Sequence, residues 1–273
     1  MNKKDIINQI KIKKSFLCIG LDADLERIPK HLLKYEDPIY EFNKQIIDST
    51  KDLCVAFKIN TAFYESIGSS GWNSMKKTLD YIPENILRIA DAKRGDIGNT
   101  SKKYAEAFFK HLNFDAITLS AYMGIETLTH YNSYENKWCI ILALTSNAGS
   151  SDFQTVADNE GVPLYERVIK SSLKLKRNDN IMFVVGATKE DNYDNIRKIA
   201  PDNFLLVPGV GAQGGNLETV SNNLINKDCG ILINSSRSII YSGSNKNFAI
   251  CARESAKALQ NDMQKILKSN RII

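Results

Sequence analysis

The sequence predicts a (β/α)8 barrel, because eight short apolar runs alternate with segments of helical spacing along its 273 residues. Strands that alternate with helices are normally parallel strands joined by crossovers. The runs are apolar at consecutive positions, which is typical of strands covered on both faces. Eight such units in about 250 residues fit the length of this barrel. A doubly wound open sheet is the alternative, but no G-x-G-x-x-G motif follows the first run.

The expected elements follow one another in a regular order. The strands occupy residues 15–21, 54–60, 86–90, 116–120, 139–144, 181–186, 204–209 and 230–234. The main helices occupy residues 38–52, 101–112, 163–174, 191–200 and 249–267. Asp37 is a suitable N-cap for the first of these helices, and Pro38 takes the first helical position, where its missing N–H costs little. Because no linker or low-complexity stretch divides the sequence, we predict a single domain over residues 1–273, with a short N-terminal helix and a C-terminal helix.

The composition excludes several classes of function. The formal net charge of +5 is dispersed and forms no basic face of the kind that binds nucleic acid. Five cysteines without a C-x-x-C pair are typical of a reduced, intracellular protein. Residues 1–14 carry charge throughout, unlike a signal peptide, and no apolar run approaches the ~18 residues of a membrane span. The three histidines are scattered, so no metal site is expected. We therefore predict a cytoplasmic protein that binds neither membranes nor nucleic acid.

Charged residues gather where the first three expected strands end. Asp22 follows the first strand, and Lys58 lies near the end of the second. The third strand runs into Asp91 and Lys93, which a period of two places on one face. Neighbouring strands lie about 4.8 Å apart, so these side chains can form one chain of alternating charge. Barrel enzymes carry their chemistry at this end of the strands. A solvated loop over residues 91–96 is the alternative, but it does not explain charge at three successive strand ends.

The segment DAKRGDIGNTSKKY, which begins at Asp91, resembles the orotidine 5′-monophosphate decarboxylase family in its longer bacterial branch. Five further motifs resemble this family and occur in the same order: GLDAD, FKIN, LTSNAGSSDF, VPGVGAQGG and NSSRSIIY. The resemblance implies decarboxylation of orotidine 5′-monophosphate to uridine 5′-monophosphate (UMP), the last step of UMP biosynthesis. It also implies that the reaction uses no metal and no organic cofactor.

The resemblance implies a role for each charged residue. Lys93 is the ammonium that stabilises the anion developing at C6 of the pyrimidine and then protonates it. Asp91 lies beside the leaving carboxylate, and Asp96 extends the charged network toward the ribose. As carboxylates that flank Lys93, both favour its charged form. Lys58 and Asp22 resemble the family's ribose-hydroxyl and network residues.

A second implication is a homodimer. In the family, the second aspartate of the Asp-x-Lys-x-x-Asp pattern and a nearby threonine reach into the site of the neighbouring subunit. Here these residues are Asp96 and Thr100. Gly95 and Gly98 would let this segment cross to the partner, although two glycines are also typical of a tight turn.

The phosphate end of the site is predicted from two loops. VPGVGAQGG (207–215) supplies several glycines after the seventh strand, including Gly214, and Ser236 and Arg237 follow the eighth. Barrels frequently hold phosphates in these two loops, and a guanidinium suits phosphate oxygens. By resemblance, Gln213 closes over the phosphate. A flexible turn with a surface arginine is the alternative.

The loop after the fifth expected strand is less clearly defined. Ser146 resembles the residue that contacts the pyrimidine edge, but Asn147 is an alternative for this contact. Ala148 stands where the longer branch often has proline, which leaves the shape of the loop open. Residues 147–162 form a long connection, suited either to a lid or to a surface elaboration.

Two other functions remain open from the sequence. A magnesium-dependent enzyme of the ribulose-phosphate group shares the Asp-x-Lys-x-x-Asp pattern, but its acidic metal ligand near the end of strand two is replaced here by Lys58. A catalytically silent phosphate-binding barrel is the second alternative. The intact array of Asp91, Lys93 and Asp96 argues against it, because binding alone does not require such charges.

Overall fold

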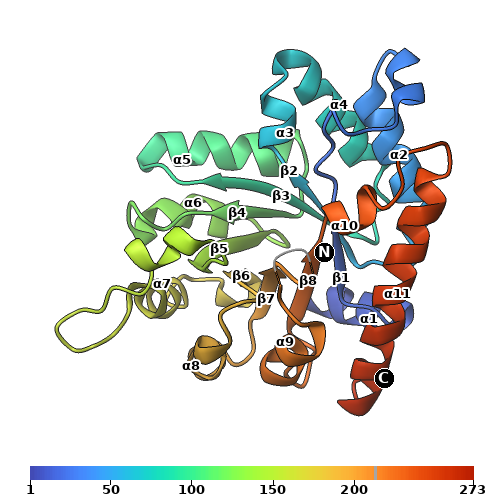
Figure 1. Ribbon diagram of the computed structural model, residues 1–273. Coiled ribbons are helices and arrows are strands. Elements are labelled where there is room, and N and C mark those ends of the chain that lie inside the picture. The colour runs from blue at the N-terminus through green and yellow to red at the C-terminus, as the bar shows by residue number, and fades with distance from the viewer. Residues whose placement is uncertain (212–213) are drawn as a thin grey trace. The chain divides into compact units, whose positions relative to one another are not determined.

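The computed structural model describes residues 1–211 and 214–273, and within them eight strands form a closed barrel in sequence order (Figure 1). The pairs β1–β2, β2–β3, β4–β5, β5–β6 and β6–β7 are parallel. This confirms the predicted (β/α)8 class and every expected strand. The strands are β1 (Leu17–Gly20), β2 (Ala56–Asn60), β3 (Leu87–Arg94), β4 (Ala116–Leu119), β5 (Trp138–Leu144), β6 (Ile181–Val185), β7 (Phe204–Pro208) and β8 (Ile231–Ser235).

The expected helices are present, but two further α-helices of eight or more residues, α4 and α9, were not anticipated. The expected helix over 101–112 divides into α5 and a π-helical turn, Glu106–His111. None of the helices in the described ranges has the length and apolar character needed to span a bilayer. The α-helices are α1 (Lys3–Lys13), α2 (Pro38–Thr50), α3 (Ala62–Glu65), α4 (Gly68–Tyr81), α5 (Gly98–Ala105), α6 (Thr129–Asn132), α7 (Leu164–Ser172), α8 (Tyr193–Ile199), α9 (Leu217–Leu224), α10 (Arg237–Ile240) and α11 (Phe248–Ser269).

Contacts within the chain define two compact units. The terminal unit comprises Lys4–Ala92 and Asn234–Ile273, and the central unit comprises Met1–Lys3 and Lys93–Ile233. The extent of a single domain over residues 1–273 stays a prediction.

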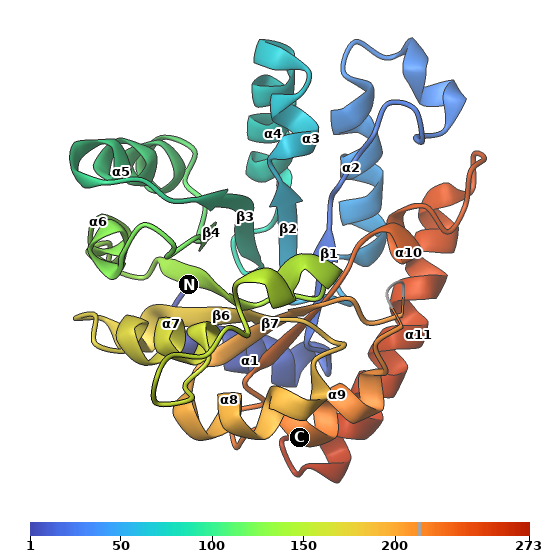
Figure 2. The same ribbon diagram turned by 60° about the vertical axis from the view of Figure 1, so that its left-hand side comes forward.

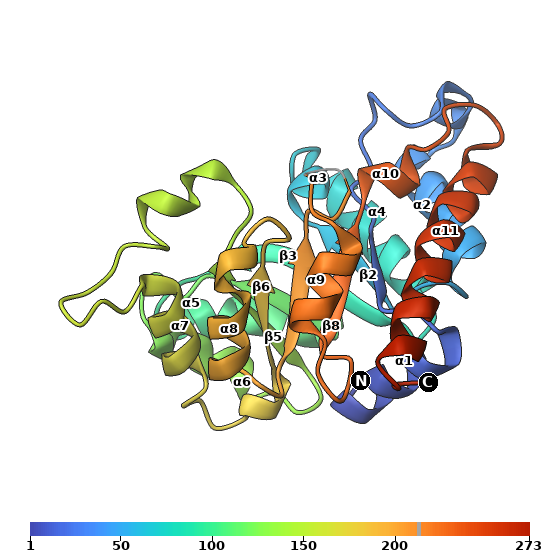
Figure 3. The same ribbon diagram turned by 60° about the horizontal axis from the view of Figure 1, so that its bottom comes forward.

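In the terminal unit, α11 packs along α2 (Figures 1 and 3). Phe42 on α2 stacks on Phe248 at a centroid distance of 5.1 Å. The side chain of Asp37 accepts a hydrogen bond from the backbone N–H of Tyr40 at 3.0 Å, which confirms Asp37 as the N-cap. Pro38 is the first residue of the helix, as predicted. The buried face of α2 and the cap at its start therefore fix this helix in the unit.

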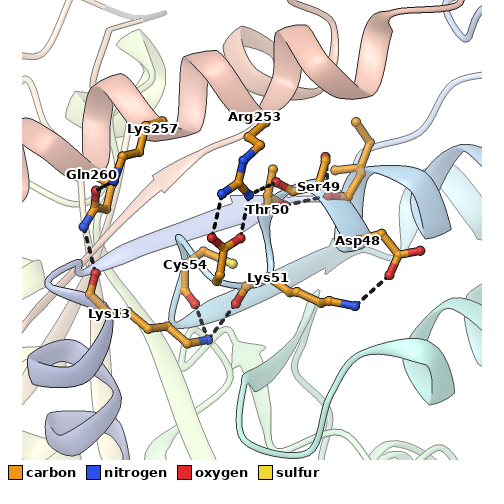
Figure 4. Close-up of polar contacts among 11 residues, drawn as sticks. Lys13, Asp48, Ser49, Thr50, Lys51, Cys54, Arg253, Lys257 and Gln260 are labelled. Atoms are coloured by element: carbon orange, nitrogen blue, oxygen red, sulfur yellow. Dashed lines mark hydrogen bonds and ion pairs between the residues drawn. The ribbon is translucent and has the colours of Figure 1, made fainter.

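The C-terminal end of α2 is held by two cationic side chains (Figure 4). The guanidinium of Arg253 on α11 forms two hydrogen bonds with the carboxylate of Asp52, at 2.7 and 2.8 Å, and a third with the carbonyl of Ser49. The ammonium of Lys13, at the end of α1, donates to the carbonyl of Lys51 at 2.8 Å. The last carbonyls of a helix have no partner within it, so these contacts join the end of α2 to α1 and α11.

The sequence pattern does not predict α4, because glycine and serine fill its first half and both are poor helix formers. Its place is set by a close approach to α3 (Figure 2). A Cβ atom on Gly71 would lie 1.8 Å from the carbonyl oxygen of Tyr64, so only glycine lets the two backbones meet in this way. Tertiary packing thus outweighs helix propensity at this position.

The central unit is stabilised by a half-buried arginine on α8. This helix lies beside α9 (Figure 3). Arg197 donates hydrogen bonds of 2.7 to 2.9 Å to the carbonyls of Ala200, Asn203, Leu224 and Gly230. Burial lowers the pKa of this guanidinium to about 10. One side chain therefore satisfies carbonyls at the ends of α8 and α9 and before β7 and β8.

Candidate active site

Three charged side chains meet in the terminal unit, at the ends of β1, β2 and β3. The Nζ atom of Lys58 donates a hydrogen bond to Oδ2 of Asp91 at 2.8 Å and lies 3.9 Å from Oδ1 of Asp22. The side chains are only 6% (Lys58), 12% (Asp91) and 14% (Asp22) exposed. The structure thus confirms the predicted alternation of charge for these three residues.

The two carboxylates determine the charge state of the lysine between them. Burial by itself lowers the pKa of Lys58, but attraction to Asp22 and Asp91, with the hydrogen bond to Asp91, outweighs burial and raises the pKa above its ordinary value. Lys58 is therefore a fixed cation at neutral pH. Among the residues with described positions, none donates a hydrogen bond to Oδ1 of Asp22, so this atom has the Lys58 ammonium as its charged neighbour.

Ser236 and Asp22 both lie against Gly20, the last residue of β1. A Cβ atom on Gly20 would lie 1.8 Å from Oγ of Ser236 and 3.4 Å from Oδ2 of Asp22. Asn234 on β8 directs its amide toward Oγ of Ser236 at 3.4 Å. Arg237 begins the four-residue helix α10, and its exposed guanidinium has no hydrogen bond or ion pair within the described residues. The structure therefore brings Ser236 close to Asp22 and leaves the Arg237 side chain accessible to a ligand.

Lys93, in the central unit, has an unusual backbone. Its φ of +48° lies in the left-handed region, which a non-glycine residue enters at a cost of about 1–3 kcal/mol. Its N–H donates to Oγ1 of the buried Thr118 on β4 at 2.9 Å, and its side chain is exposed. Because β3 is not extended at Lys93, the period of two that predicted Asp91 and Lys93 on one face does not apply here. β3 nevertheless runs to Arg94, so these residues belong to the strand and not to a solvated loop.

The remaining cation of this segment packs against aromatic rings. The guanidinium carbon of Arg94 lies 5.5 Å from the ring centroid of Tyr104 and 5.5 Å from that of Phe108. Such contacts contribute about 0.5–2 kcal/mol. Arg94 therefore connects the end of β3 to α5 and the helical turn that follows it.

Asp96 and Thr100 occupy the segment that leads into α5. Oδ1 of Asp96 accepts a hydrogen bond from the N–H of Ile97 at 2.8 Å, and Thr100 is exposed. A Cβ atom on Gly95 would lie 2.7 Å from the carbonyl oxygen of Ser120, so this glycine permits a close approach to the end of β4. Packing within the central unit therefore explains Gly95, one of the two glycines that were expected to let this segment cross to a partner.

Figures 2 and 3 show a long segment after β5. One glutamine anchors this segment to the end of the strand. The side chain of Gln154 accepts a hydrogen bond from the N–H of Thr145 at 2.7 Å and donates one to Oγ1 of Thr145 at 2.9 Å. That hydroxyl donates to Oδ1 of Asn147 at 2.6 Å. Asn147, the alternative to Ser146 for the contact with the pyrimidine edge, is thus hydrogen-bonded within the loop. Ser146 itself is half-buried, and its backbone is so close to Gly186 that a Cβ atom there would lie 2.7 Å from Cα of Ser146.

The expected phosphate loop is only partly described. Gln213 lies outside the described residues. Gly214 has a φ of +86°, which favours glycine and accounts for its presence in the loop.

Comparison with known proteins identifies close relatives of the whole chain. Residues 15–250 match the model of the Orotidine 5′-phosphate decarboxylase / HUMPS family. The orotidine 5′-phosphate decarboxylase of Phocaeicola vulgatus is 52% identical over 98% of this chain and 99% of its own, and that of Flavobacterium johnsoniae is 53% identical over the same shares. The solved structure of Leishmania donovani OMP decarboxylase is 34% identical and superimposes with a TM-score of 0.84. The match covers 97% of this chain and 99% of that structure.

Proposed function

The chain belongs to the orotidine 5′-phosphate decarboxylase family, and we propose that Lys93, Asp91, Lys58 and Asp96 carry its reaction. The decarboxylase function, and with it a place in UMP biosynthesis, follows from family membership and from relatives 52–53% identical over nearly the full chain. The role of each residue is the proposal. The observation that carries it is the Asp22–Lys58–Asp91 array, which holds the Asp91 carboxylate in place two residues before Lys93.

The reaction breaks the bond between C6 and the carboxylate carbon of orotidine 5′-monophosphate. CO2 leaves, the electron pair stays on C6, and a proton from the Lys93 ammonium forms the new C6–H bond. A fixed positive charge next to C6 stabilises the anion as it develops and so lowers the barrier. Asp91 lies beside the departing carboxylate, and its hydrogen bond to Lys58 restricts where it can move. Protonation at C6 then completes UMP.

The sugar and phosphate are assigned to separate residues. Asp22 and Asp96 are proposed to contact the ribose hydroxyls, and Ser146 the pyrimidine edge. The exposed guanidinium of Arg237, next to Ser236, supports a role in binding the phosphate. Gln213 and Gly214 are proposed to contribute to the same function from the loop after β7.

We further propose a homodimer in which Asp96 and Thr100 enter the partner's site. The central unit exposes large apolar side chains next to this segment: Ile97 is 56% exposed, Tyr122 80% and Phe153 62%. The Tyr122 and Phe153 rings are 6.4 Å apart, and exposed apolar patches often mark protein interfaces. The buried free cysteines support a reduced, cytoplasmic setting for this enzyme.

The decisive assay follows loss of the orotate chromophore after the protein has been treated with a chelator. We expect turnover without added magnesium, because the Lys58 ammonium stands where a metal-dependent relative needs an acidic ligand. Turnover that requires magnesium would contradict the proposed mechanism. Lys93→Ala should abolish turnover and still bind UMP, whereas Lys102→Ala, an exposed lysine on α5, should behave as wild type. Normal turnover by Lys93→Ala would refute the role of this lysine.

Subunit mixing tests the dimer. Lys93→Ala and Asp96→Ala are each expected to be inactive alone. If Asp96 acts across a twofold interface, a mixed dimer has one site that carries both substitutions and one that carries neither. Random 1:1 mixing should then restore about a quarter of the wild-type activity. No recovery, with mixed dimers present by mass spectrometry, would place Asp96 in the site of its own subunit.

A further inference from the structure

The hydroxyl of Tyr241 bridges the two peptide groups on either side of Ala23. It accepts a hydrogen bond from the N–H of Asp24 at 2.8 Å and donates one to the carbonyl of Asp22 at 3.1 Å. The chain leaves β1 at this point, and the Asp22 side chain faces Lys58 from here. One phenol therefore fixes the backbone that carries the first carboxylate of the charged array.

The ring that carries this hydroxyl contacts two other side chains. It stacks on Phe42 at a centroid distance of 5.6 Å and an interplanar angle of 19°, and the guanidinium carbon of Arg27 lies 4.2 Å from its centroid. Burial raises the pKa of Tyr241 to about 12, so the hydroxyl keeps its proton and can donate at neutral pH. Its position is therefore set by packing as well as by hydrogen bonding.

Tyr241 also belongs to the segment that bears Ser236 and Arg237. It follows α10 directly, and its backbone N–H donates to the carbonyl of Arg237 at 3.2 Å, which closes the single turn of this helix. Ile239 and Ile240 on the same turn are fully buried, so the turn is attached to the core on its inner side. One hydrogen-bonded turn therefore connects Arg237 to Tyr241.

We infer that Tyr241 is a positioning residue that couples the phosphate-binding residues to Asp22. The inference rests on the roles of Asp22, Ser236 and Arg237 given in the proposed function. Phosphate bound by Arg237 and Ser236 orders the α10 turn, the turn fixes the phenol, and the phenol fixes the Asp22–Asp24 backbone. The orientation of the Asp22 carboxylate toward Lys58 and the ribose is then set partly by the far end of the substrate.

Tyr241→Phe removes both hydrogen bonds of the hydroxyl and keeps the ring between Phe42 and Arg27. Together the two hydrogen bonds correspond to more than a tenfold change. We expect kcat/KM for orotidine 5′-monophosphate to fall at least tenfold. The matched control is Tyr81→Phe, which removes a hydroxyl that donates an exposed hydrogen bond to Oδ2 of Asp48 at 2.8 Å. This variant should leave kcat/KM unchanged.

A double-mutant cycle separates coupling from a general loss of structure. If Tyr241 acts through Asp22, the double variant Tyr241→Phe/Asp22→Asn should be no slower than Asp22→Asn alone. Losses that multiply would overturn the inference and leave the proposed function intact. An Asp22→Asn variant with wild-type kcat/KM would instead contradict the proposed role of Asp22, so the two failures are distinct.

Competitive inhibition by UMP and by uridine gives a second readout that does not depend on the fraction of active protein. Coupling predicts that Tyr241→Phe weakens the binding of UMP, which carries the phosphate, at least threefold more than the binding of uridine, which lacks it. A purely structural role leaves the ratio of the two inhibition constants at its wild-type value. An unchanged ratio would therefore overturn the inference even if kcat/KM had fallen.

Discussion

Replacement of Lys58 by methionine should destabilise the protein far more than loss of an ordinary ion pair. Methionine keeps the length and apolar stem of the side chain but removes the ammonium that lies between Asp91 and Asp22. The two carboxylates, 12% and 14% exposed, are then left without this cation. Breaking a buried pair in this way exposes the cost of burying its remaining charges.

The size of the effect follows from the distances. With an effective dielectric constant of about 20, attraction across 2.8 Å is worth about 6 kcal/mol and attraction across 3.9 Å about 4 kcal/mol. The cost of burying the ammonium, several kcal/mol, offsets much of this gain. Measured losses for one broken buried pair are about 3–5 kcal/mol, and we expect Lys58→Met to fall in this range.

Urea unfolding followed by circular dichroism measures the difference. Lys77→Met is the matched control, because it removes a half-exposed lysine that lies 3.3 Å from Asp37, and such surface pairs contribute about 0–1 kcal/mol. Lys58→Met/Asp91→Asn should recover part of the loss, since it removes one of the two carboxylates that the Lys58 ammonium neutralises. If Lys58→Met were no less stable than Lys77→Met, the account of the charged array would be wrong.

The pH dependence has a definite sign. The folded-state pKa of Lys58 is raised above its unfolded value, so its stabilisation is complete below the unfolded pKa of about 10.4 and is lost only as pH rises through the folded pKa. The gap between wild type and Lys58→Met should therefore stay constant from pH 7 to 9. In acid it should shrink, because low pH neutralises the carboxylate charges that lose the Lys58 ammonium in the variant. A gap that widened on acidification would refute the argument.

Three further predictions concern other parts of the chain. Thr118→Val removes the acceptor of the Lys93 N–H and should lower kcat about tenfold, whereas Thr118→Ser keeps a hydroxyl and should have the wild-type kcat. Equal kcat in wild type and both variants would show that the hydroxyl does not position Lys93. Arg197→Met leaves several buried carbonyls unpaired and should cost at least 3 kcal/mol in urea unfolding, against less than about 1 kcal/mol for the exposed Arg167→Met. Ellman's reagent should modify Cys251 first in the native protein, because the other four cysteines are buried; faster reaction of any of those would contradict the structure.

The barrel and the first three charges could be predicted from the sequence because both depend on local patterns. Apolar runs identify the strands whatever their partners, and the spacing of parallel strands brings Lys58 to Asp91 and Asp22 once the strand order is known. The backbone of Lys93 could not be predicted in this way. Its N–H is hydrogen-bonded to Thr118, a residue on the next strand that no motif marks.

Close approaches were missed for a similar reason. Gly20 and Gly71 are required by atoms of Ser236 and Tyr64, and a glycine in a sequence does not show what lies against it. The role of Tyr241 depends on an interaction between the last turn of one motif, NSSRSIIY, and the backbone of another, GLDAD. Motifs read one at a time indicate the chemistry of a site, but not the contacts that join its parts.

The structure also provides a reason to choose between the two lysines of the proposed site. Lys58 is 6% exposed, and its neighbouring carboxylates raise its pKa, so it retains its proton strongly and is poorly suited to give it to carbon. Lys93 is exposed, and its strained backbone is fixed by Thr118. A proton donor must reach a ligand that arrives from solution, whereas a structural cation must stay between its carboxylates. These requirements favour the proposal that Lys93 protonates C6 and that Lys58 holds Asp91 and Asp22 in place.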